Sequence, residues 1–565
     1  MKYRWTFREL PDERIIHTLA DKLQIPRSLA CVLAARGVRD GIGAENFFTP
    51  QLENLHSPFL MDGMEKAVER IEYAIRHKEL IWIHGDYDVD GTTSTAMTLQ
   101  FLRELGAEVQ YYIPDRLSEG YGLSTASITA AKEAGATLLI TVDCGITSVD
   151  AVALANSMGF DCIVVDHHKP GEALPDALSI LDPIKPGCNY PFKALAACGV
   201  AFKLCHALAI SRGEPERAFN YLDFVAIASA ADIVPILDEN RILMHFGLEI
   251  LNTFPRPGFK GLFECAGIEI GTVTTASVVY GLAPRINAAG RVGSARRAVE
   301  MMIQKDELVA FRIAQELEQE NRRRRAFDEV AFDDASRRAD VFLKDSNKRS
   351  LVLYSEDWHA GVIGIVASRL VERFNMPSVM LTKFDDYAKG SARSVRSFDI
   401  FSALKNCEGH LQEFGGHKHA AGVSLKIENI DAFREAFDEQ ARGGISQEML
   451  LPEIVIDTEL RLNELSPDFF QVIKKFAPFG HQNFKPVFHA KNVTSANGVR
   501  IVGNNHLKFR ALQSNFAIDA IGFNLGDKIE HCTNGKMFSL AFTLEENTFN
   551  GQTAPQLRLR DVRPE

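Results

Sequence analysis

Short β-branched segments alternate with amphipathic segments between residues 64 and 168 of the chain. Four segments repeat their apolar positions every three or four residues and are predicted as helices: residues 64–79, 94–106, 124–135 and 148–159. Four apolar runs that follow them are predicted as strands: residues 80–88, 108–114, 137–146 and 162–168. Strands that alternate with helices in this way favour a doubly wound, mainly parallel α/β sheet.

The pattern changes three times after this region. Residues 294–345 are highly charged and lack Pro and Gly, and we expect a long, solvent-exposed connecting helix there. Residues 346–445 return to strand and helix patterns and predict a second, smaller α/β domain. Residues 453–565 hold short strands with turn residues between them, which predict an all-β barrel. We also expect a helical lead-in at residues 1–45 and the first α/β domain at residues 46–293. Two loops are expected, at residues 271–293 and 389–400.

Acidic and histidine side chains follow the predicted strands of the first domain. Residues 83–96 read IHGDYDVDGTTSTA and place three carboxylates at alternating positions directly after an apolar run. In open α/β sheets, ligands bind outside the carboxyl ends of the strands, so side chains there meet in one crevice. We expect the following residues to converge at that edge: His84, Asp86, Asp88, Asp143, Asp166, His167, His168 and Asp232.

This convergence predicts a metal site. A single Asp at a strand end is most often the N-cap of the next helix, but five unpaired carboxylates in one crevice would repel one another strongly. Carboxylates with one or two imidazoles and no thiolate suit Mg²⁺ or Mn²⁺ better than Zn²⁺. The set exceeds what one ion needs if positions stay open for substrate, so we predict two ions bridged by a carboxylate such as Asp143. Such a site activates water for in-line attack at phosphorus.

Composition sets the class of protein but not its substrate. The 565 residues are too many for one hydrophobic core, and nine scattered cysteines indicate free thiols in a reducing compartment. The N-terminus lacks the apolar segment of a signal peptide and no run of 18 apolar residues occurs, so we expect a cytoplasmic protein without a membrane span. The net charge of −11 hides an excess of Lys and Arg, 13 against 9 acidic residues, within 461–565. Net charge therefore does not exclude a nucleic-acid partner.

Seven segments carry a resemblance to known enzymes. HGDYDVDG, TVDCGI, the Asp-His-His of VVDHHKP, and ASAADIVPI resemble the four successive motifs of the DHH phosphoesterase superfamily. APRINAAGR (283–291), GSARS (390–394) and FGGHKHAAG (414–422) resemble its RecJ branch, which are single-strand-specific 5′→3′ exonucleases. The resemblance covers the chain from about residue 45 through the C-terminal barrel.

The resemblance implies roles for the residues at the strand ends. It implies the following metal ligands: Asp86, Asp88, Asp143, His167 and Asp232. His84 is similar to a further ligand or a group that supports one, and His168 would orient or protonate. Asp166 would be either a ligand or a carboxylate that holds an imidazole, and Asp90 would support the ligands or the turn into the next helix.

Small-residue segments that carry arginine suit phosphate groups, because backbone can approach a ligand closely there. By resemblance, Arg285 and Asn287 hold nucleotide near the metals, while Ser391, Arg393 and His417 contact a 5′ phosphate. We expect Gly415 and Gly416 to bind substrate through their N–H groups, because Ser391 and His417 are predicted nearby, although the pair could form only a turn. Tyr121 would either stack on a base or take an ordinary structural role. The run NRRRR at 321–325 is either a nucleic-acid patch or a solvated face balanced by Glu316, Glu318 and Glu320.

The sequence therefore predicts a metal-dependent, single-strand-specific DNA exonuclease that acts in recombination and repair. We expect a strand to pass between the two α/β domains and to release 5′ mononucleotides, with an oligonucleotide-binding barrel that holds 12 of the 37 Phe. The alternative is a DHH phosphatase of short oligonucleotides or nucleoside bisphosphates, which deletion of residues 453–565 would distinguish. A non-catalytic DNA-binding scaffold is disfavoured by the complete ligand set. The family implies a single-strand-binding protein and a RecQ-like helicase as partners, and we expect a monomer.

Overall fold

Five parallel strands form the sheet that carries the acidic strand ends, in the order β3-β2-β4-β5-β6. Their bounds are β2 (Leu80–Gly85), β3 (Glu108–Tyr112), β4 (Leu138–Val142), β5 (Asp161–Val165) and β6 (Ser179–Leu181). The predicted α/β class with a parallel sheet is confirmed. The three residues of β6 were not predicted, because so short a run shows no periodicity.

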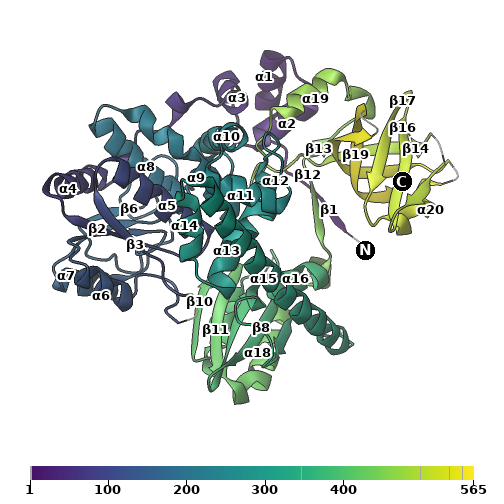
Figure 1. Ribbon diagram of the computed structural model, residues 1–565. Coiled ribbons are helices and arrows are strands. Elements are labelled where there is room, and N and C mark those ends of the chain that lie inside the picture. Colours follow the sequence, from purple (N-terminus) through teal and green to yellow (C-terminus); the bar gives the residue numbers. More distant parts are fainter. Residues whose placement is uncertain are drawn as a thin grey trace. The chain divides into compact units, whose positions relative to one another are not determined.

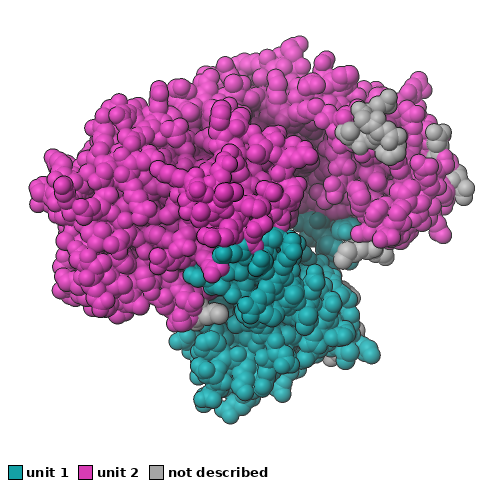
Figure 2. Space-filling view, viewed as in Figure 1, with its two compact units in different colours: residues 1–4, 288–294, 316–453 teal, residues 5–287, 295–315, 454–565 magenta. Residues whose placement is uncertain are grey.

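A computed structural model describes residues 3–116, 118–344, 347–396, 398–496, 498–533, 535–549 and 552–565. The chain divides into two compact units (Figure 2). One unit comprises residues 5–287, 295–315 and 454–565, and the other comprises residues 1–4, 288–294 and 316–453. Among the described residues, no helix is both long and apolar enough to cross a membrane.

Helices cover both faces of the parallel sheet (Figure 1). On one face, α6 (Thr125–Glu133) and α7 (Val149–Ser157) enclose a core that includes Trp82, Leu139 and Val164. On the other face lie α5 (Val89–Glu104) and α8 (Ala197–Ser211). Because both faces are covered, the central strands β4 and β5 are mostly apolar and buried, and polar side chains collect at their ends.

Further helices complete this domain, namely α4 (Met64–His77), α9 (Leu222–Ala231), α10 (Asp238–Thr253) and α11 (Pro257–Ala266). The loop predicted at 271–293 is wrong over most of its length. It contains α12 (Thr275–Ser277), a π-helical turn (Val278–Leu282) and α13 (Ala283–Val292). Four buried side chains recur every three or four residues along it and provide the missed helical signal: Val278, Leu282, Ile286 and Ala289.

The predicted connecting helix is two helices, α14 (Arg296–Ile303) and α15 (Glu307–Phe342). The side chain of Gln304 accepts hydrogen bonds from the backbone N–H groups of Lys305 and Asp306 at 2.9 and 3.0 Å, which ends the first helix. The expectation that α15 is solvent-exposed is wrong for one face, which buries the following residues: Ala310, Ala314, Leu317, Asn321, Arg324, Asp328, Ala331, Ala335 and Ala339. Three polar residues in the middle of this face hide it from a hydrophobic pattern.

A second sheet has the strand order β10-β11-β9-β8-β7. Its strands are β7 (Leu351–Tyr354), β8 (Ser378–Phe384), β9 (Tyr387–Arg393), β10 (Glu413–His417) and β11 (Ala420–Lys426). Only β7 and β8 run parallel. Three helices belong to this domain, α16 (Ile363–Phe374), α17 (Ile400–Asn406) and α18 (Ile430–Gly444). The loop predicted at 389–400 is wrong at its start, since GSAR belongs to β9, which pairs on both sides despite its Gly and Ser.

Five strands close the predicted C-terminal barrel in the order β14-β18-β19-β17-β16, with β16 paired back to β14. They are β14 (Phe488–Ser495), β16 (His506–Gln513), β17 (Phe516–Gly522), β18 (Phe538–Phe549) and β19 (Gln552–Pro564), and the short β15 (Arg500–Val502) pairs with β16. Seven Phe are buried in or beside it: Phe469, Phe470, Phe476, Phe488, Phe509, Phe538 and Phe542.

The helical lead-in and the barrel share one hydrophobic core. Helices α1 (Glu13–Leu23), α2 (Arg27–Ala35) and α3 (Gly41–Phe48) pack in the same cluster as α19 (Pro467–Lys474) and the barrel strands. Removal of residues 453–565 would expose this core to water. The deletion suggested by the sequence therefore cannot separate substrate binding from unfolding.

Candidate metal centre and active site

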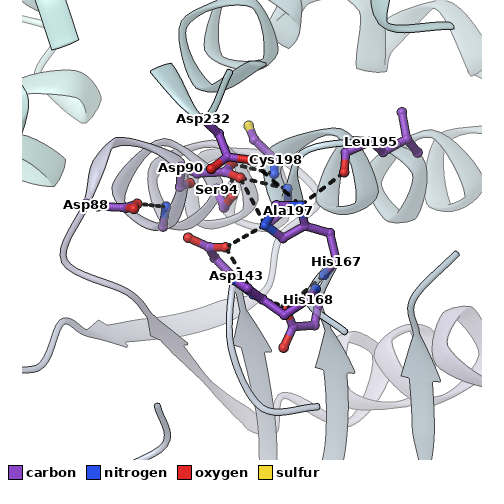
Figure 3. Close-up of polar contacts among 12 residues, drawn as sticks. Asp88, Asp90, Ser94, Asp143, His167, His168, Leu195, Ala197, Cys198 and Asp232 are labelled. Carbon is purple, nitrogen blue, oxygen red and sulfur yellow. Dashed lines mark hydrogen bonds and ion pairs between the residues drawn. The ribbon is translucent and has the colours of Figure 1, made fainter. Parts of the chain in front are cut away.

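Carboxylates and imidazoles from four segments of the parallel domain meet above the strand ends (Figure 3). Three groups of side chains each bring potential ligand atoms within 4.8 Å of one another: Asp86, Asp88 and Asp143; Asp143, His167 and His168; and Asp90, His167 and Asp232. Asp86 follows β2, Asp143 follows β4, His167 follows β5, and Asp232 caps the end of α9. The structure thus brings together most of the residues that the sequence predicted to converge.

The contacts of His167 and Asp143 fit a bound cation. His167 Nδ1 lies 3.1 Å from the carbonyl oxygen of Leu195, which can only accept, so this nitrogen carries the hydrogen. The other ring nitrogen, Nε2, lies 3.4 Å from Asp143 Oδ1 and can offer its lone pair to a cation. Oδ1 of Asp86 and Oδ1 of Asp143 are buried without a hydrogen-bond partner among the described residues. Bare oxygens beside an imidazole lone pair suit divalent ions with oxygen and nitrogen ligands.

The electrostatics of the cluster also favour a cation. Burial, together with the carboxylates of Asp90 and Asp88, raises the pKa of Asp143 well above its usual range. Burial and Asp88 raise the pKa of Asp86 in the same way. The same two causes, burial and nearby carboxylates, raise the pKa of Asp232 to about 8. The protein itself supplies too little positive charge to keep all these groups ionised, so the residues fit a divalent metal.

Divalent binding to this cluster is expected to release protons at neutral pH. Asp232, with a pKa of about 8, holds a proton at pH 7 that a bound cation displaces. Because this pKa lies above the ordinary value of 3.8, protonation of Asp232 stabilises the folded protein relative to the unfolded chain. This stabilisation is complete below about pH 4 and is lost as the pH rises through 8. Calorimetric titration with Mn²⁺ at pH 7, in buffers of different ionisation enthalpy, should show about one proton or more released. An apparent enthalpy that is identical in every buffer would contradict this expectation.

Asp166 holds the backbone and ring of the Asp-His-His segment. Its Oδ1 lies 2.8 Å from His168 Nδ1 and accepts the backbone N–H of His167, while Oδ2 accepts that of Ile146 at 2.9 Å. Burial opposes a charged His168, but the hydrogen bond and charge of Asp166 outweigh it and raise the pKa of His168 to about 9. The Tyr121 hydroxyl lies 3.0 Å from the same Nδ1 and donates to the carbonyl oxygen of Asp143. Tyr121 thus supports the histidine, and Asp166 takes the supporting role of its two alternatives.

The helix cap at the start of α5 belongs to a different carboxylate than the sequence suggested. Asp88, and not Asp90, is the N-cap of α5, since its Oδ1 accepts the Gly91 N–H at 3.1 Å. Asp90 instead accepts the backbone N–H groups of Ala197 and Cys198, each at 2.8 Å, at the start of α8. The positive end of a helix stabilises a buried carboxylate. Asp90 therefore joins α5 to α8 beside His167, whose Nε2 lies 3.8 Å away.

The structure gives His84 other partners, and we remove it from the proposed ligand set. Side chains alternate along β2, so His84 points to the same face as Trp82, beneath α6. Its Nδ1 lies 2.8 Å from Ser127 Oγ and its Nε2 lies 3.1 Å from the carbonyl oxygen of Gly122. Burial lowers its pKa to about 4, so the ring is neutral.

Two residues near the cluster were not predicted. The guanidinium of Arg116 lies 4.8 Å from the ring centroid of Tyr87, and its charge lowers the pKa of Asp86 against the larger effect of burial. Asp182 follows β6, and its Oδ2 is buried without a hydrogen-bond partner among the described residues. Burial raises the pKa of Asp182 to about 7. In the sequence, Asp182 could have been identified as a strand-end residue because it directly follows the apolar run SIL. Arg116 could have been identified because it lies in the same loop as Tyr121.

Arg285 is engaged by the protein in this structure. Its Nη1 donates to the carbonyl oxygen of Gly281 at 2.6 Å and its Nη2 to that of Cys265 at 3.0 Å. These contacts fasten the start of α13 to the end of α11. Asn287, two residues later on α13, is only half-buried. A nucleotide contact stays a prediction for both residues, and the geometry supports Asn287 better.

Three strands of the second sheet align the remaining predicted residues. Arg393, Ala420 and His417 lie opposite one another across β9, β11 and β10, and Ser391, Gly422 and Gly415 form the next row on the same face. Arg393 Nη1 donates to Ser391 Oγ at 2.8 Å. An added Cβ at Gly364, in the first turn of α16, would lie 3.0 Å from Arg393 Nη2. Gly415 and Gly422 have open space where a Cβ would lie, so the two rows form an open surface. This surface is called the shelf below.

The shelf has the chemistry of an anion site. It combines a guanidinium, a hydroxyl and the first turn of a 12-residue helix, whose N-cap Val362 provides no side-chain cap. Gly415 and Gly416 lie in an edge strand and not in a turn. Gly416 has φ +144°, and a Cβ there would lie 2.4 Å from the carbonyl oxygen of Ala420, so only glycine fits.

The NRRRR run does not form a single patch. Arg324 is buried and donates to Asn321 Oδ1 at 2.9 Å, whereas Arg322 pairs with Glu318 at 2.9 Å. Arg323 lies 5.5 Å from the ring centroid of Phe327. The four arginines therefore form neither a single nucleic-acid patch nor a single solvated face.

A basic row crosses the outer face of the barrel. Arg500, Lys508, Ile521 and Arg558 lie opposite one another on β15, β16, β17 and β19. The guanidinium of Arg558 lies 5.0 Å from the ring centroid of Phe523, which is 44% exposed. Cations in a row beside an exposed aromatic ring are typical of surfaces that bind single-stranded nucleic acid.

Three family models match the chain. Residues 80–229 match the DHH family N-terminal domain, residues 347–443 the DHHA1 domain, and residues 456–561 the RecJ OB domain. These ranges do not fix where each domain begins and ends, so the predicted boundaries stay predictions.

Known proteins resemble the chain over its full length. It is 37% identical to the single-stranded-DNA-specific exonuclease RecJ of Bacillus subtilis (strain 168), in a match that covers 99% of this chain and 71% of that protein. A crystal structure of RecJ in complex with Mn²⁺ from Thermus thermophilus has a TM-score of 0.85 and 29% identity, and it covers 100% of this chain and 80% of that one. A second crystal structure from the same organism, in complex with Mg²⁺, has a TM-score of 0.78 and 27% identity, with coverages of 100% and 78%.

Proposed function

Because the chain belongs to the RecJ family, we propose that it is a single-stranded-DNA-specific exonuclease that hydrolyses phosphodiester bonds from the 5′ end. The observation that carries the proposal is the cluster of carboxylates and imidazole at the end of the parallel sheet, in which Asp86 and Asp143 each have a buried oxygen without a hydrogen-bond partner among the described residues. A site of this kind has the ligands for metal-assisted hydrolysis at phosphorus. The proposed products are 5′ mononucleotides, and the proposed role is in DNA recombination and repair.

The proposed cofactors are two divalent ions, Mn²⁺ or Mg²⁺. The residues that would hold them are Asp86, Asp88, Asp143, His167 and Asp232. When bound, the ions supply positive charge that activates a water molecule and stabilises the charge developing on the phosphodiester. His84 has no part in this set.

The protein's own groups position the reaction. Leu195 fixes the ring of His167 through Nδ1, and Asp90 ties the start of α8 to α5 beside that ring. His168, charged at neutral pH and held by Asp166 through Nδ1, keeps Nε2 to protonate or bind a substrate oxygen. Arg116 adds positive charge beside Asp86. Positioning and charge stabilisation of this kind account for most phosphoryl-transfer catalysis.

The 5′ phosphate is proposed to bind on the shelf of Ser391, Arg393 and His417. Substitution Arg393→Gln removes the guanidinium, and we expect kcat/KM on 5′-phosphorylated single strands to fall about 10- to 100-fold. The same variant should act equally on 5′-phosphate and 5′-hydroxyl strands. Rates on matched oligonucleotides measure both effects. Arg396→Gln, at a largely exposed side chain, is the control, and an equal loss on both strands in Arg393→Gln would contradict a 5′-phosphate role.

The barrel is proposed to bind the strand through its basic row. We expect the double substitution Lys508→Gln and Arg558→Gln to weaken binding and to reduce the slope of log affinity against log salt by about 1.4, or about 0.7 for each lost phosphate contact. Fluorescence anisotropy with a labelled oligonucleotide in EDTA measures the slope. Lys491→Gln on β14, which loses an exposed pair with Glu459, is the control. An unchanged slope in the double variant would place the DNA elsewhere.

The second candidate, an oligonucleotidase or bisphosphate phosphatase, is distinguished by substrate length. A polymer nuclease that binds the strand through the basic row of the barrel should show a kcat/KM that depends on substrate length. We expect it to rise at least about tenfold between a dinucleotide and a strand of about 20 nucleotides. A phosphatase of short substrates should show no such rise. Steady-state rates at fixed ionic strength over a length series decide between them.

Partners and cellular context follow from the family and stay proposals. Single-stranded DNA is the proposed substrate, and a single-strand-binding protein and a RecQ-like helicase are the proposed protein partners. We also propose a cytoplasmic, monomeric enzyme. The nine cysteines form no disulfide and eight of them are buried, which fits a reducing compartment.

A further inference from the structure

Ile233 directly follows the proposed ligand Asp232 and adopts a left-handed backbone conformation with φ +60°. Helix α9 ends at Ala231 and Asp232 caps it, so Ile233 occupies the next position, where Gly or Asn is usual. Twelve described non-glycine residues have positive φ, and Ile233 is the β-branched one among them. The others are Asn, Asp, Gln, Lys or Ser. A branched Cβ is strained in this region, so isoleucine is an unfavourable choice for the backbone.

The residues that follow hold Ile233 in this conformation. Val234 and Ile236 are buried, and the Ile236 N–H donates to the carbonyl oxygen of His481 at 2.9 Å. The side chain of Asn240 donates to the carbonyl oxygen of Pro235 at 3.0 Å. The chain must therefore turn at Ile233, where glycine would serve with less strain.

Packing does not explain the isoleucine either. Ile233 is 61% exposed, in contrast to the buried Val234 and Ile236. The adjacent Asp232 Oδ2 lies 3.9 Å from His167 Nδ1, so Ile233 stands at the rim of the carboxylate cluster. A strained residue with an exposed apolar side chain beside a reaction centre is typical of a position retained for ligand contact.

From these observations we infer that Ile233 is a substrate-contacting residue that packs against the deoxyribose and base of the nucleotide at the cluster. Apolar contact of this kind binds any base, which suits an enzyme that degrades strands of every sequence. A free phosphate would gain nothing from it. The inference rests on the proposed function, because it requires a nucleotide at the carboxylate site.

The test is the substitution Ile233→Gly, which removes both the strain and the side chain. We expect the thermal transition of the metal-free protein to rise by about 1 to 3 °C. We expect KM for single-stranded DNA to rise about five- to tenfold while kcat stays within about twofold, because the lost contact binds the ground state and transition state alike. Ile233→Asn, which tolerates the same backbone conformation, should raise KM in the same way. Ile270→Asn, at an exposed turn residue without positive φ, should change none of these values.

Two results would overturn the inference. An unchanged KM in both Ile233 variants would show that the side chain does not touch substrate. A lower thermal transition together with a lower kcat would show that isoleucine instead holds Asp232 in place. Failure of the wild-type protein to hydrolyse single-stranded DNA would reject the proposed function, a result independent of the KM comparison between variants.

Discussion

Asp143→Asn should reduce divalent-dependent hydrolysis of single-stranded DNA on the order of 10³-fold or more. Asp143 belongs to two of the three ligand groups, and its Oδ1 is buried without a hydrogen-bond partner among the described residues. The substitution keeps the shape of the side chain and removes its charge. Because one of several crowded carboxylates is neutralised, the metal-free protein should be as stable as the wild type or more so.

Two measurements together make this prediction specific. The rate loss is measured with an end-labelled oligonucleotide, and the thermal transition is measured with and without Mn²⁺. The wild type should gain stability from Mn²⁺, and Asp143→Asn should lose most of that gain. Asp176→Asn, at an exposed loop carboxylate, is the matched control and should change neither. Residual hydrolysis equal to that of the wild type would contradict the assignment of Asp143.

Arg241→Met should lower the thermal transition by about 2 to 5 °C, from a loss of about 2 to 4 kcal/mol in unfolding free energy. Arg241 lies on α10 and is buried, and its guanidinium donates to four carbonyl oxygens at 2.7 to 3.0 Å, those of Phe47, Lys475, Phe476 and Ala477. Burial lowers its pKa to about 9, so it is charged at neutral pH. Methionine fills much of the space but leaves the buried carbonyl groups without donors.

Arg241 connects three segments of one unit by hydrogen bonds. It joins α10 of the parallel domain to the end of α3 and to the segment that follows α19. Arg36, the C-cap residue of α2, holds the same segment further on by donating to the carbonyl oxygen of Phe484 at 2.9 Å. Arg241→Met should therefore also increase protease cleavage between residues 475 and 484. Arg296→Met, which removes an exposed pair with Glu300 at 3.0 Å, should shift the transition by about 1 °C or less. Equal effects in the two variants would contradict the role of Arg241.

Local pattern predicted the site better than it predicted the surroundings. The alternation of apolar strands and helices placed Asp86, Asp143 and His167 at one edge, because parallel strands end together. The same reasoning failed for His84, which precedes the strand end by one residue. The pleat turns it to the opposite face of the sheet from its neighbour Ile83, where Ser127 binds it.

The remaining differences come from contacts between distant segments. The lead-in helices pack in one core with the barrel, more than 400 residues later, which no local periodicity can show. The buried face of α15 escaped detection because Asn321, Arg324 and Asp328 occupy its centre. The positive φ at Ile233 could not be predicted either, because isoleucine is typical of a strand or a core and not of the end of a helix.

Digestion of end-labelled DNA tests the central claim most directly. Single-stranded and duplex oligonucleotides, each labelled at the 5′ or the 3′ end, are incubated with Mn²⁺, Mg²⁺ or EDTA. We predict that the 5′ label appears at once as a mononucleotide from the single strand, that the 3′-labelled strand shortens step by step, and that duplex and EDTA samples stay intact. Release of the 3′ label first, equal digestion of duplex, or full activity in EDTA would contradict the account.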